Sequence, residues 1–177
     1  MNPDPANETP TPVFLWCTEA KPGEQDYHAG FRGQLDVAAA GEVEFRVFGA
    51  SWFTGWIDGE YFCEGPARFP LAFPEYQTWR VKLGAGRHTL AFQVHHLGVS
   101  TRMLLVIEPF LSCLARADGR ELPVHWKCAR LDGYVSQVRR INPQLGFIEW
   151  CDTRKLPDWR AGGFDDAAWV APMRVER

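Results

Sequence analysis

The feature that most constrains the fold is an Asp58-Gly59 pair set between two short apolar segments. Trp56-Ile57 precede the pair and Tyr61-Phe62 follow it. A two-residue reversal requires positive backbone φ angles, which Asp tolerates and Gly adopts freely, so the sequence predicts a tight β-hairpin here. Gly65-Pro66 is expected to end the second strand, because proline has no N–H to donate and glycine resists extended order. A loop should follow.

Alternating apolar residues predict further strands on both sides of the hairpin. From Glu42 to Phe48, apolar side chains occupy every second position, which is typical of a strand buried on one face. Residues 78–83 and 87–95 are expected to pair as a second hairpin across a glycine-rich loop, and 104–110 to form a buried central strand. Other strands are expected at 13–17, 28–37 and 124–130. Short strands, frequent turns and no helical periodicity before residue 150 predict an all-β, antiparallel β-sandwich.

The two ends of the chain differ from this strand-rich middle. Residues 1–12 are rich in Pro, Asn and Thr and are expected to form a flexible polar tail. Residues 13–170 are the predicted sandwich, and its last part, 154–169, is expected to wrap the sandwich as a coil held by separate aromatic anchors. Asp165-Asp166 in that coil is a predicted cap for one short helical turn. Residues 171–177 are expected to be a linker to a further domain.

Composition and charge narrow the classes of partner. The formal net charge is −3 and the pI is near 5.9, which provides no basic field to attract nucleic acid. No apolar run approaches the roughly 18 residues that a membrane helix requires. The five cysteines lack the spacing of a metal site, and an odd number fits a disulfide framework poorly. We therefore expect a cytoplasmic protein with reduced thiols that binds neither nucleic acid nor a membrane.

The hairpin and a second motif resemble a known family. The run from Trp56 to Arg68 is similar to the hairpin in the N-terminal β-sandwich domains of bacterial α-L-rhamnosidases, the family 78 glycoside hydrolases. The segment from Phe147 to Arg154, followed by Gly163 to Trp169, resembles the segment that closes the same domain. Asp58 stands where the family often carries Asn, which keeps the turn and adds a charge. The resemblance implies a galactose-binding-like sandwich of the jelly-roll type.

The function implied by this resemblance is an accessory one. Family 78 enzymes carry their catalytic carboxylates in a downstream (α/α)₆ barrel of several hundred residues, whereas this sequence has 177. The chain is therefore expected to be non-catalytic, carbohydrate-associated and docked on a downstream catalytic domain. The carboxylates near the hairpins are expected to occupy turns and solvent-facing positions rather than to form the pair that glycoside hydrolysis requires. They are Asp58, Glu60, Glu64, Glu149 and Asp152.

Other chemistries have little support in the sequence. No serine has the glycine context of a nucleophile elbow. His95 and His96 adjoin, with His88 and His125 on neighbouring predicted strands. Because adjacent strand residues face opposite sides, His95 and His96 are not expected to bind one ion. The Asp, Asn and Gly spacing of a calcium loop is missing as well. No catalytic residue, metal site or cofactor is predicted.

The hypothesis that remains is carbohydrate binding by aromatic and polar side chains. Aromatic rings pack on the apolar faces of pyranoses, and charged groups bind the hydroxyls. The candidate binding residues lie in or near the loops around the first hairpin. They are Trp52, Trp56, Glu64, Arg68, Tyr76 and Trp79. The alternative for each ring is packing in the core, and the alternative for Arg68 is a buried ion pair that fixes its loop.

A purely structural or interaction domain is the alternative function. Its exposed aromatic residues would then face a catalytic domain or a second copy of the chain in a homodimer. The two functions predict different surfaces. A sugar-binding face mixes aromatic rings with polar groups, whereas a docking face is a contiguous apolar patch.

Overall fold

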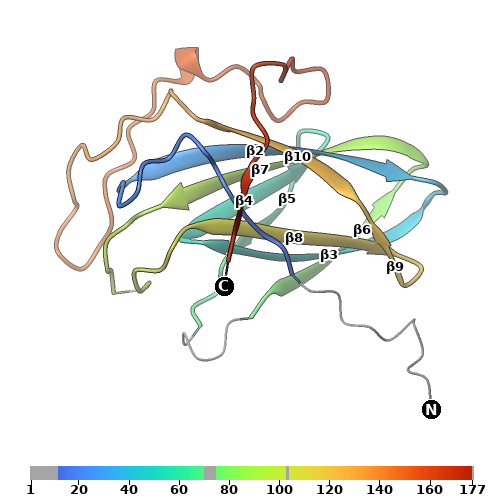
Figure 1. The fold of residues 1–177 in the computed structure, drawn as a ribbon, viewed down its shortest axis with the longest axis horizontal. Helices are drawn as coiled ribbons and strands as arrows, with labels where there is room; N and C mark the ends of the chain where they lie inside the picture. The colour runs from blue at the N-terminus through green and yellow to red at the C-terminus, as the bar shows by residue number, and fades with distance from the viewer. Residues whose placement is uncertain (1–11, 70–74, 103, 177) are drawn as a thin grey trace.

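The structure is a computed structural model that describes residues 12–69, 75–102 and 104–176. Two antiparallel sheets pack face to face in it (Figure 1). The strands are β1 (Phe14–Trp16), β2 (Tyr27–Val37), β3 (Gly41–Ala50), β4 (Trp52–Ile57), β5 (Glu60–Gly65), β6 (Gln77–Leu83), β7 (Gly86–His96), β8 (Phe110–Ala117), β9 (Arg120–Leu122), β10 (Val124–Arg130) and β11 (Met173–Val175). One sheet has the order β11-β1-β8-β3-β6, with β9 paired to β8, and the other has the order β10-β2-β7-β4-β5. The predicted all-β sandwich is confirmed.

The predicted hairpin is the connection between β4 and β5. Asp58 and Gly59 have φ angles of 52° and 87°, so both central residues of the turn are in the left-handed region. Trp56 pairs with Tyr61 across the turn, as expected. The side chain of Asp58 adds a second link, because its Oδ1 accepts a hydrogen bond of 2.8 Å from the backbone N–H of Thr89 on β7.

The core lies between the sheets and is built by alternation. Val43, Phe45 and Val47 of β3 have no exposed surface, and they face Phe31 of β2 and Phe92 of β7 from the other sheet. Their intervening neighbours are charged and point to solvent. Burial of a large apolar side chain stabilises the fold by about 1.5–3 kcal/mol, so this strand is fixed in register by its own pattern.

Two strand predictions were wrong. The expected hairpin between residues 78–83 and 87–95 does not form, because β6 pairs with β3 in one sheet while β7 lies in the other sheet. Both edges of β7 are occupied by β2 and β4, which leaves no edge for β6. The glycine-rich link instead crosses from one layer to the other. Residues 104–109 are not a strand, and Leu105 and Val106 are more than half exposed.

The C-terminal part of the chain also differs from expectation in detail. No helix follows Asp165-Asp166, where a single turn forms instead. Beyond the predicted domain end at residue 170, β11 pairs with β1, so the sheet extends into the stretch expected to be a linker. The only helix in residues 12–69, 75–102 and 104–176 is the 3₁₀ turn η2 (Thr153–Lys155), and no helix there is long and apolar enough to span a membrane.

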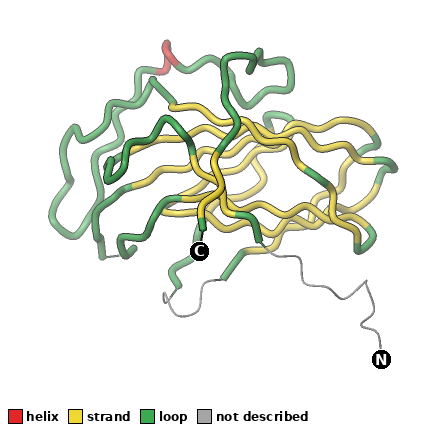
Figure 2. The backbone as a smooth tube through the Cα atoms, viewed as in Figure 1, coloured by secondary structure: helices red, strands yellow, loops and turns green. Residues whose placement is uncertain are grey.

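Residues 131–170, here called the covering segment, lie over the outer face of the five-stranded sheet as an extended coil (Figures 1 and 2). Arg32 of β2 attaches the segment, since its buried guanidinium donates to the backbone oxygens of Trp159 and Ala161 and pairs with Asp166 at 3.1 Å. The packing leaves no space at Gly30, where a Cβ atom would approach Leu131 to 2.7 Å. The coil that was expected to wrap the sandwich is therefore packed closely against the outer face of the sheet.

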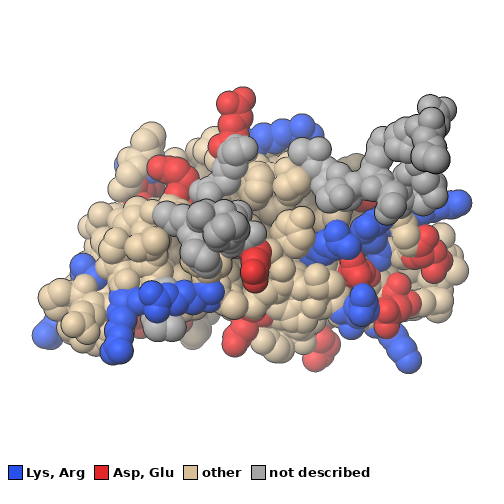
Figure 3. All heavy atoms as spheres, turned by 90° about the horizontal axis from the view of Figure 1, so that it is seen from below, with Lys and Arg blue, Asp and Glu red and all other residues tan. Residues whose placement is uncertain are grey.

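Positive and negative side chains are interspersed on the opposite side of the molecule, seen from below in Figure 3. Glu44 on β3, for example, bonds Arg46 at 2.9 Å and Arg80 of β6 at 3.2 Å. Neither sign dominates this face, in agreement with the small net charge of the chain.

Replacing Arg32 with Met is expected to lower the free energy of unfolding by about 3 kcal/mol, because it leaves two backbone oxygens and a carboxylate without their buried partner. Urea unfolding followed by circular dichroism measures this loss. The matched control is Arg87→Met, which removes an exposed pair with Asp36 and should change stability little. A loss below about 1 kcal/mol for Arg32→Met would contradict the role given to this side chain.

Replacing Asp58 with Asn should change the pH dependence of stability. Both ring nitrogens of His88 face acceptors, Asp58 Oδ2 at 2.7 Å and Gly84 O at 3.0 Å, which suits the protonated ring. The hydrogen bond to Asp58 raises the pKa of His88. A raised pKa stabilises the fold below the ordinary value of about 6.5, and the effect disappears as pH rises through the folded value.

The melting temperatures of the parent chain and of Asp58→Asn, compared between pH 5 and pH 9, test this linkage. Asn keeps the turn geometry and the acceptor for Thr89, so the variant should fold. The parent chain is expected to be more stable at the acid end, with the difference shrinking as pH rises. A difference that does not depend on pH would refute the linkage.

Candidate functional site

The outer face of the five-stranded sheet carries a row of aromatic and polar side chains beside the covering segment. On β4, Phe53, Gly55 and Ile57 are buried on the core side, so the side chains of Trp52, Thr54 and Trp56 point outward. Strand register then fixes their neighbours. Trp52 lies opposite His95 of β7, and Thr54 lies between Gln93 of β7 and Glu64 of β5.

Two cavities adjoin Trp52. One, of about 340 Å³, lies between the sheet residues Gln93 and His95 and the covering segment, which contributes residues 145–147 and Glu149. The other, of about 470 Å³, lies beside the end of β5, where Glu64 and Gln77 line it. Trp52, Phe53 and Thr54 line both cavities, which we call together the Trp52 cleft. Each cavity has the size of a small-ligand pocket.

The polar groups of the cleft have spare hydrogen-bonding capacity. The buried Oε1 of Gln77 accepts no hydrogen bond from the part of the chain that the structure describes. Within the same residues, the exposed carboxylates of Glu64 and Glu149 form no ion pair. An orphaned buried acceptor is costly, by about 1–3 kcal/mol, unless water or a ligand donates to it. The cleft therefore offers an aromatic ring flanked by acceptors.

The structure brings together two of the six residues predicted to bind carbohydrate. Trp52 is 37% exposed at the centre of the cleft, and Glu64 lies on the wall of the larger cavity. Tyr76 is exposed in the connection that leads to β6, and Arg68 is exposed after β5, but neither lines the cleft.

The other two predicted residues serve packing. Trp56 meets Trp159 of the covering segment edge to face, with ring centroids 5.9 Å apart, and lies beneath Arg160. Trp79 packs on Phe53 at 6.1 Å, on the core side of the sandwich. Trp79 lies there because β6 belongs to the other sheet, so the inward-facing ring of Trp79 cannot reach the outer face of β4.

Several cleft residues, Gln77 among them, were not predicted as binding residues. Alternation along the 87–95 strand could have placed Gln93 and His95 on one face, but only the register with β4 sets them beside Trp52. Glu149 was considered solely as a catalytic carboxylate. Its position depends on the path of the covering segment, for which the sequence carries no periodic signal.

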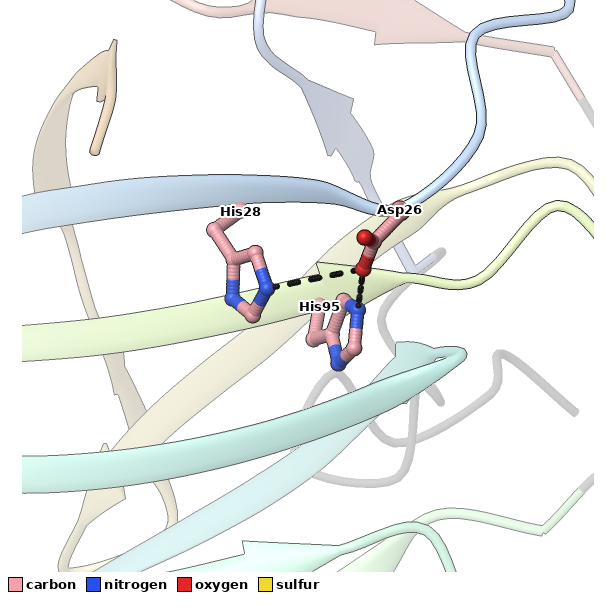
Figure 4. A group of neighbouring side chains, drawn as sticks. All are labelled: Asp26, His28 and His95. Atoms are coloured by element: carbon pink, nitrogen blue, oxygen red, sulfur yellow. Dashed lines mark hydrogen bonds and ion pairs between the residues drawn. The ribbon is translucent and has the colours of Figure 1, made fainter. Parts of the chain in front are cut away.

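A second group, Asp26, His28 and His95, adjoins the cleft (Figure 4). The carboxylate of Asp26 is buried just before β2, at a positive φ of 53°. Its Oδ1 accepts a hydrogen bond of 2.8 Å from Nε2 of His95 and lies 3.8 Å from Nε2 of His28. Its Oδ2 accepts from the backbone N–H of Gln137 in the covering segment. The cluster thus joins two strands to the segment above them.

The imidazole rings of the cluster are stacked and largely shielded from water. His28 lies between His95 at 3.8 Å and Tyr134 at 3.9 Å, with nearly parallel planes. Burial, reinforced by the nearby His95, lowers the pKa of His28 to about 2, so this ring is neutral. His96 faces the other side of the strand, against Trp16, as alternation predicts. Among the residues that the structure describes, Asp26, His28 and His95 form a group that could hold a metal ion.

Known structures share this architecture. The family 78 rhamnosidase of Bacillus sp. GL1 matches with a TM-score of 0.87 at 27% identity, over 96% of this chain and 19% of that one. The α-L-rhamnosidase of Aspergillus terreus matches with a TM-score of 0.69 at 14% identity, over 98% of this chain and 22% of that one. A lectin of Pleurotus ostreatus, solved in complex with GalNAc, matches with a TM-score of 0.59 at 13% identity, over 94% of this chain and 45% of the lectin chain.

The matches below 25% identity show a common fold, and the first also shares sequence over nearly the whole of this chain. No protein-family model matches the sequence, and no curated protein sequence does. The chain spans about a fifth of the length of the rhamnosidases that it matches. It is therefore similar to one part of the family 78 rhamnosidase of Bacillus sp. GL1, consistent with one of the accessory β-sandwich domains of such an enzyme.

Proposed function

We propose that this chain is a non-catalytic accessory domain of an α-L-rhamnosidase-like glycoside hydrolase and that it binds carbohydrate in the Trp52 cleft. The observation that carries the proposal is an exposed indole placed between two cavities whose walls supply unpaired acceptors. The ring of Trp52 would pack on the apolar face of a sugar. Glu64, Glu149 and the amide of Gln77 would accept hydrogen bonds from its hydroxyls.

The positions of the carboxylates support binding rather than hydrolysis. Glycoside hydrolysis requires two carboxyl groups on either side of one glycosidic bond, about 5–10 Å apart. Glu64 and Glu149 line different cavities, with Trp52 between them. Such a constellation can hold a sugar at several points, but it does not enclose one bond between an acid and a base. The five free thiols agree with a cytoplasmic location, which is part of the same proposal.

A second candidate function is docking on other domains of the same glycosidase. Backbone hydrogen bonds tie Val135 to Trp150 and Arg139 to Ile148, which folds the start of the covering segment into an irregular arm. Apolar side chains are exposed along this arm. They are Val135, Val138, Ile141, Leu145, Ile148 and Trp150. Because the matched rhamnosidases are about five times longer than this chain, a further domain of such an enzyme is the occupant that we propose for this surface.

Calorimetric titration with L-rhamnose, D-galactose and a rhamnose-bearing glycoside tests the carbohydrate proposal. Binding is expected at millimolar affinity, about 4 kcal/mol, because the cleft is open and holds one exposed ring. Trp52→Ala should abolish the binding heat. Glu64→Gln should weaken binding several-fold while keeping the indole, so that quenching of intrinsic fluorescence can be followed in the same variant.

Tyr61→Ala is the matched control, since Tyr61 is an exposed aromatic residue on the same hairpin that does not line the cleft. This variant should bind as the parent chain does. Heat that stays flat at tens of millimolar sugar would refute the carbohydrate proposal and leave docking as the function. Equal losses in Tyr61→Ala and Trp52→Ala would show that the cleft is not the site.

A further inference from the structure

The buried carboxylate of Asp26 has no permanently charged partner among the described residues. Its neighbours are the imidazoles of His28 and His95 and one backbone N–H, from Gln137. A buried carboxylate that lacks a cation carries a large desolvation cost, which a bound metal ion offsets more completely than a neutral hydrogen-bond donor does.

The cluster presents three suitable donor atoms. Each residue offers one ligand atom, and these atoms lie within 4.8 Å of one another. Ligands in a tetrahedral zinc site bind at about 2.0–2.2 Å from the ion, which places them roughly 3.4 Å apart. Binding would therefore draw the most distant donors together by roughly 1.4 Å. It would also require the ring of His95 to turn out of its stacked position on His28, so that both Nε2 lone pairs point at the ion. Two imidazoles and one carboxylate are ligands typical of zinc and related divalent ions.

The surrounding groups orient these donors as outer ligands of metal sites do. The N–H of Gln137 holds Oδ2 of Asp26 and leaves Oδ1 towards the two histidines. The Gln93 amide lies 3.2 Å from Nδ1 of His28, the nitrogen that faces away from Asp26, and Tyr134 donates to the same amide at 3.2 Å. When this amide is turned over, its oxygen accepts from Nδ1–H of His28 and its NH₂ group donates to the hydroxyl of Tyr134, which leaves Nε2 of His28 available to a metal.

We propose that Asp26, His28 and His95 bind one divalent transition-metal ion, with zinc the best fit, in a site that opens towards the Trp52 cleft. His95 lines the smaller cavity of the cleft, so water or a ligand hydroxyl from that cavity can complete a four-coordinate shell. The ion would join β2, β7 and the covering segment at one point. The proposal does not depend on sugar binding, and its test does not use sugar.

Cobalt(II) titration of the chelator-stripped full chain provides the first readout. One ion per chain is expected, with visible d–d absorption but without the near-ultraviolet charge-transfer band that thiolate ligands produce. That distinction matters because Cys17 and Cys128 are buried neighbours and could bind metal through sulfur. Zinc should displace the cobalt and raise the melting temperature of the chain.

Asp26→Asn and His95→Gln should each weaken zinc binding by at least tenfold in calorimetry. His125→Gln is the matched control, because His125 is an exposed histidine on β10 outside the cluster. X-ray absorption of the zinc-loaded parent chain supplies a readout that needs no variant, and it should show imidazole and oxygen ligands without sulfur. The proposal would be overturned by the absence of stoichiometric binding, by sulfur ligands, or by unchanged zinc affinity in both cluster variants. The cluster would then serve only to hold β2, β7 and the covering segment together through hydrogen bonds.

Discussion

The buried guanidinium of Arg32 is the interaction on which the outer layer of this protein depends. It extends from the middle of β2 and binds two backbone oxygens and a carboxylate of the covering segment, while its Cζ atom lies 5.2 Å from the centroid of the Phe164 ring. A buried cation with these partners has few alternative positions, because each lost bond leaves a desolvated group behind. The segment is therefore seated on the sheet at one place. That position determines where its arm forms a wall opposite Trp52.

Much of the sandwich could be predicted because its signals are local. Asp58-Gly59 specifies a turn through backbone φ angles alone, and β3 specifies its inner face through strict alternation. The pairing of β6 could not be predicted in this way, since a short glycine-rich link permits either a hairpin or a crossing between layers. Only the competition for the edges of β7, decided by β2 and β4, settles that choice. Residues 104–109 show the same limit, because an apolar run without a partner strand remains a loop.

The candidate site was less predictable than the fold because it is assembled from β4, β5, β6, β7 and the covering segment. Trp52 and Glu64, which line the cleft, were predicted from their place beside the hairpin. The position of Trp79 on the core side could not be predicted, because an aromatic residue in a strand pattern does not reveal which sheet the strand joins. Asp26 and His28 lie about seventy residues from His95 in sequence, so their cluster exists only through the pairing of β2 with β7. Long-range register, which single-sequence patterns do not encode, is the missing information in each case.

Sugar recognition in the Trp52 cleft is the function proposed for this chain. The most direct measurement is a two-dimensional ¹H–¹⁵N NMR titration of the labelled chain with L-rhamnose. The account predicts saturable shifts of the Trp52 indole N–H and of backbone amides near Glu64 and Gly146, while the buried indole of Trp16 stays unchanged. Shifts that gather elsewhere, or a spectrum that does not respond at tens of millimolar sugar, would contradict it.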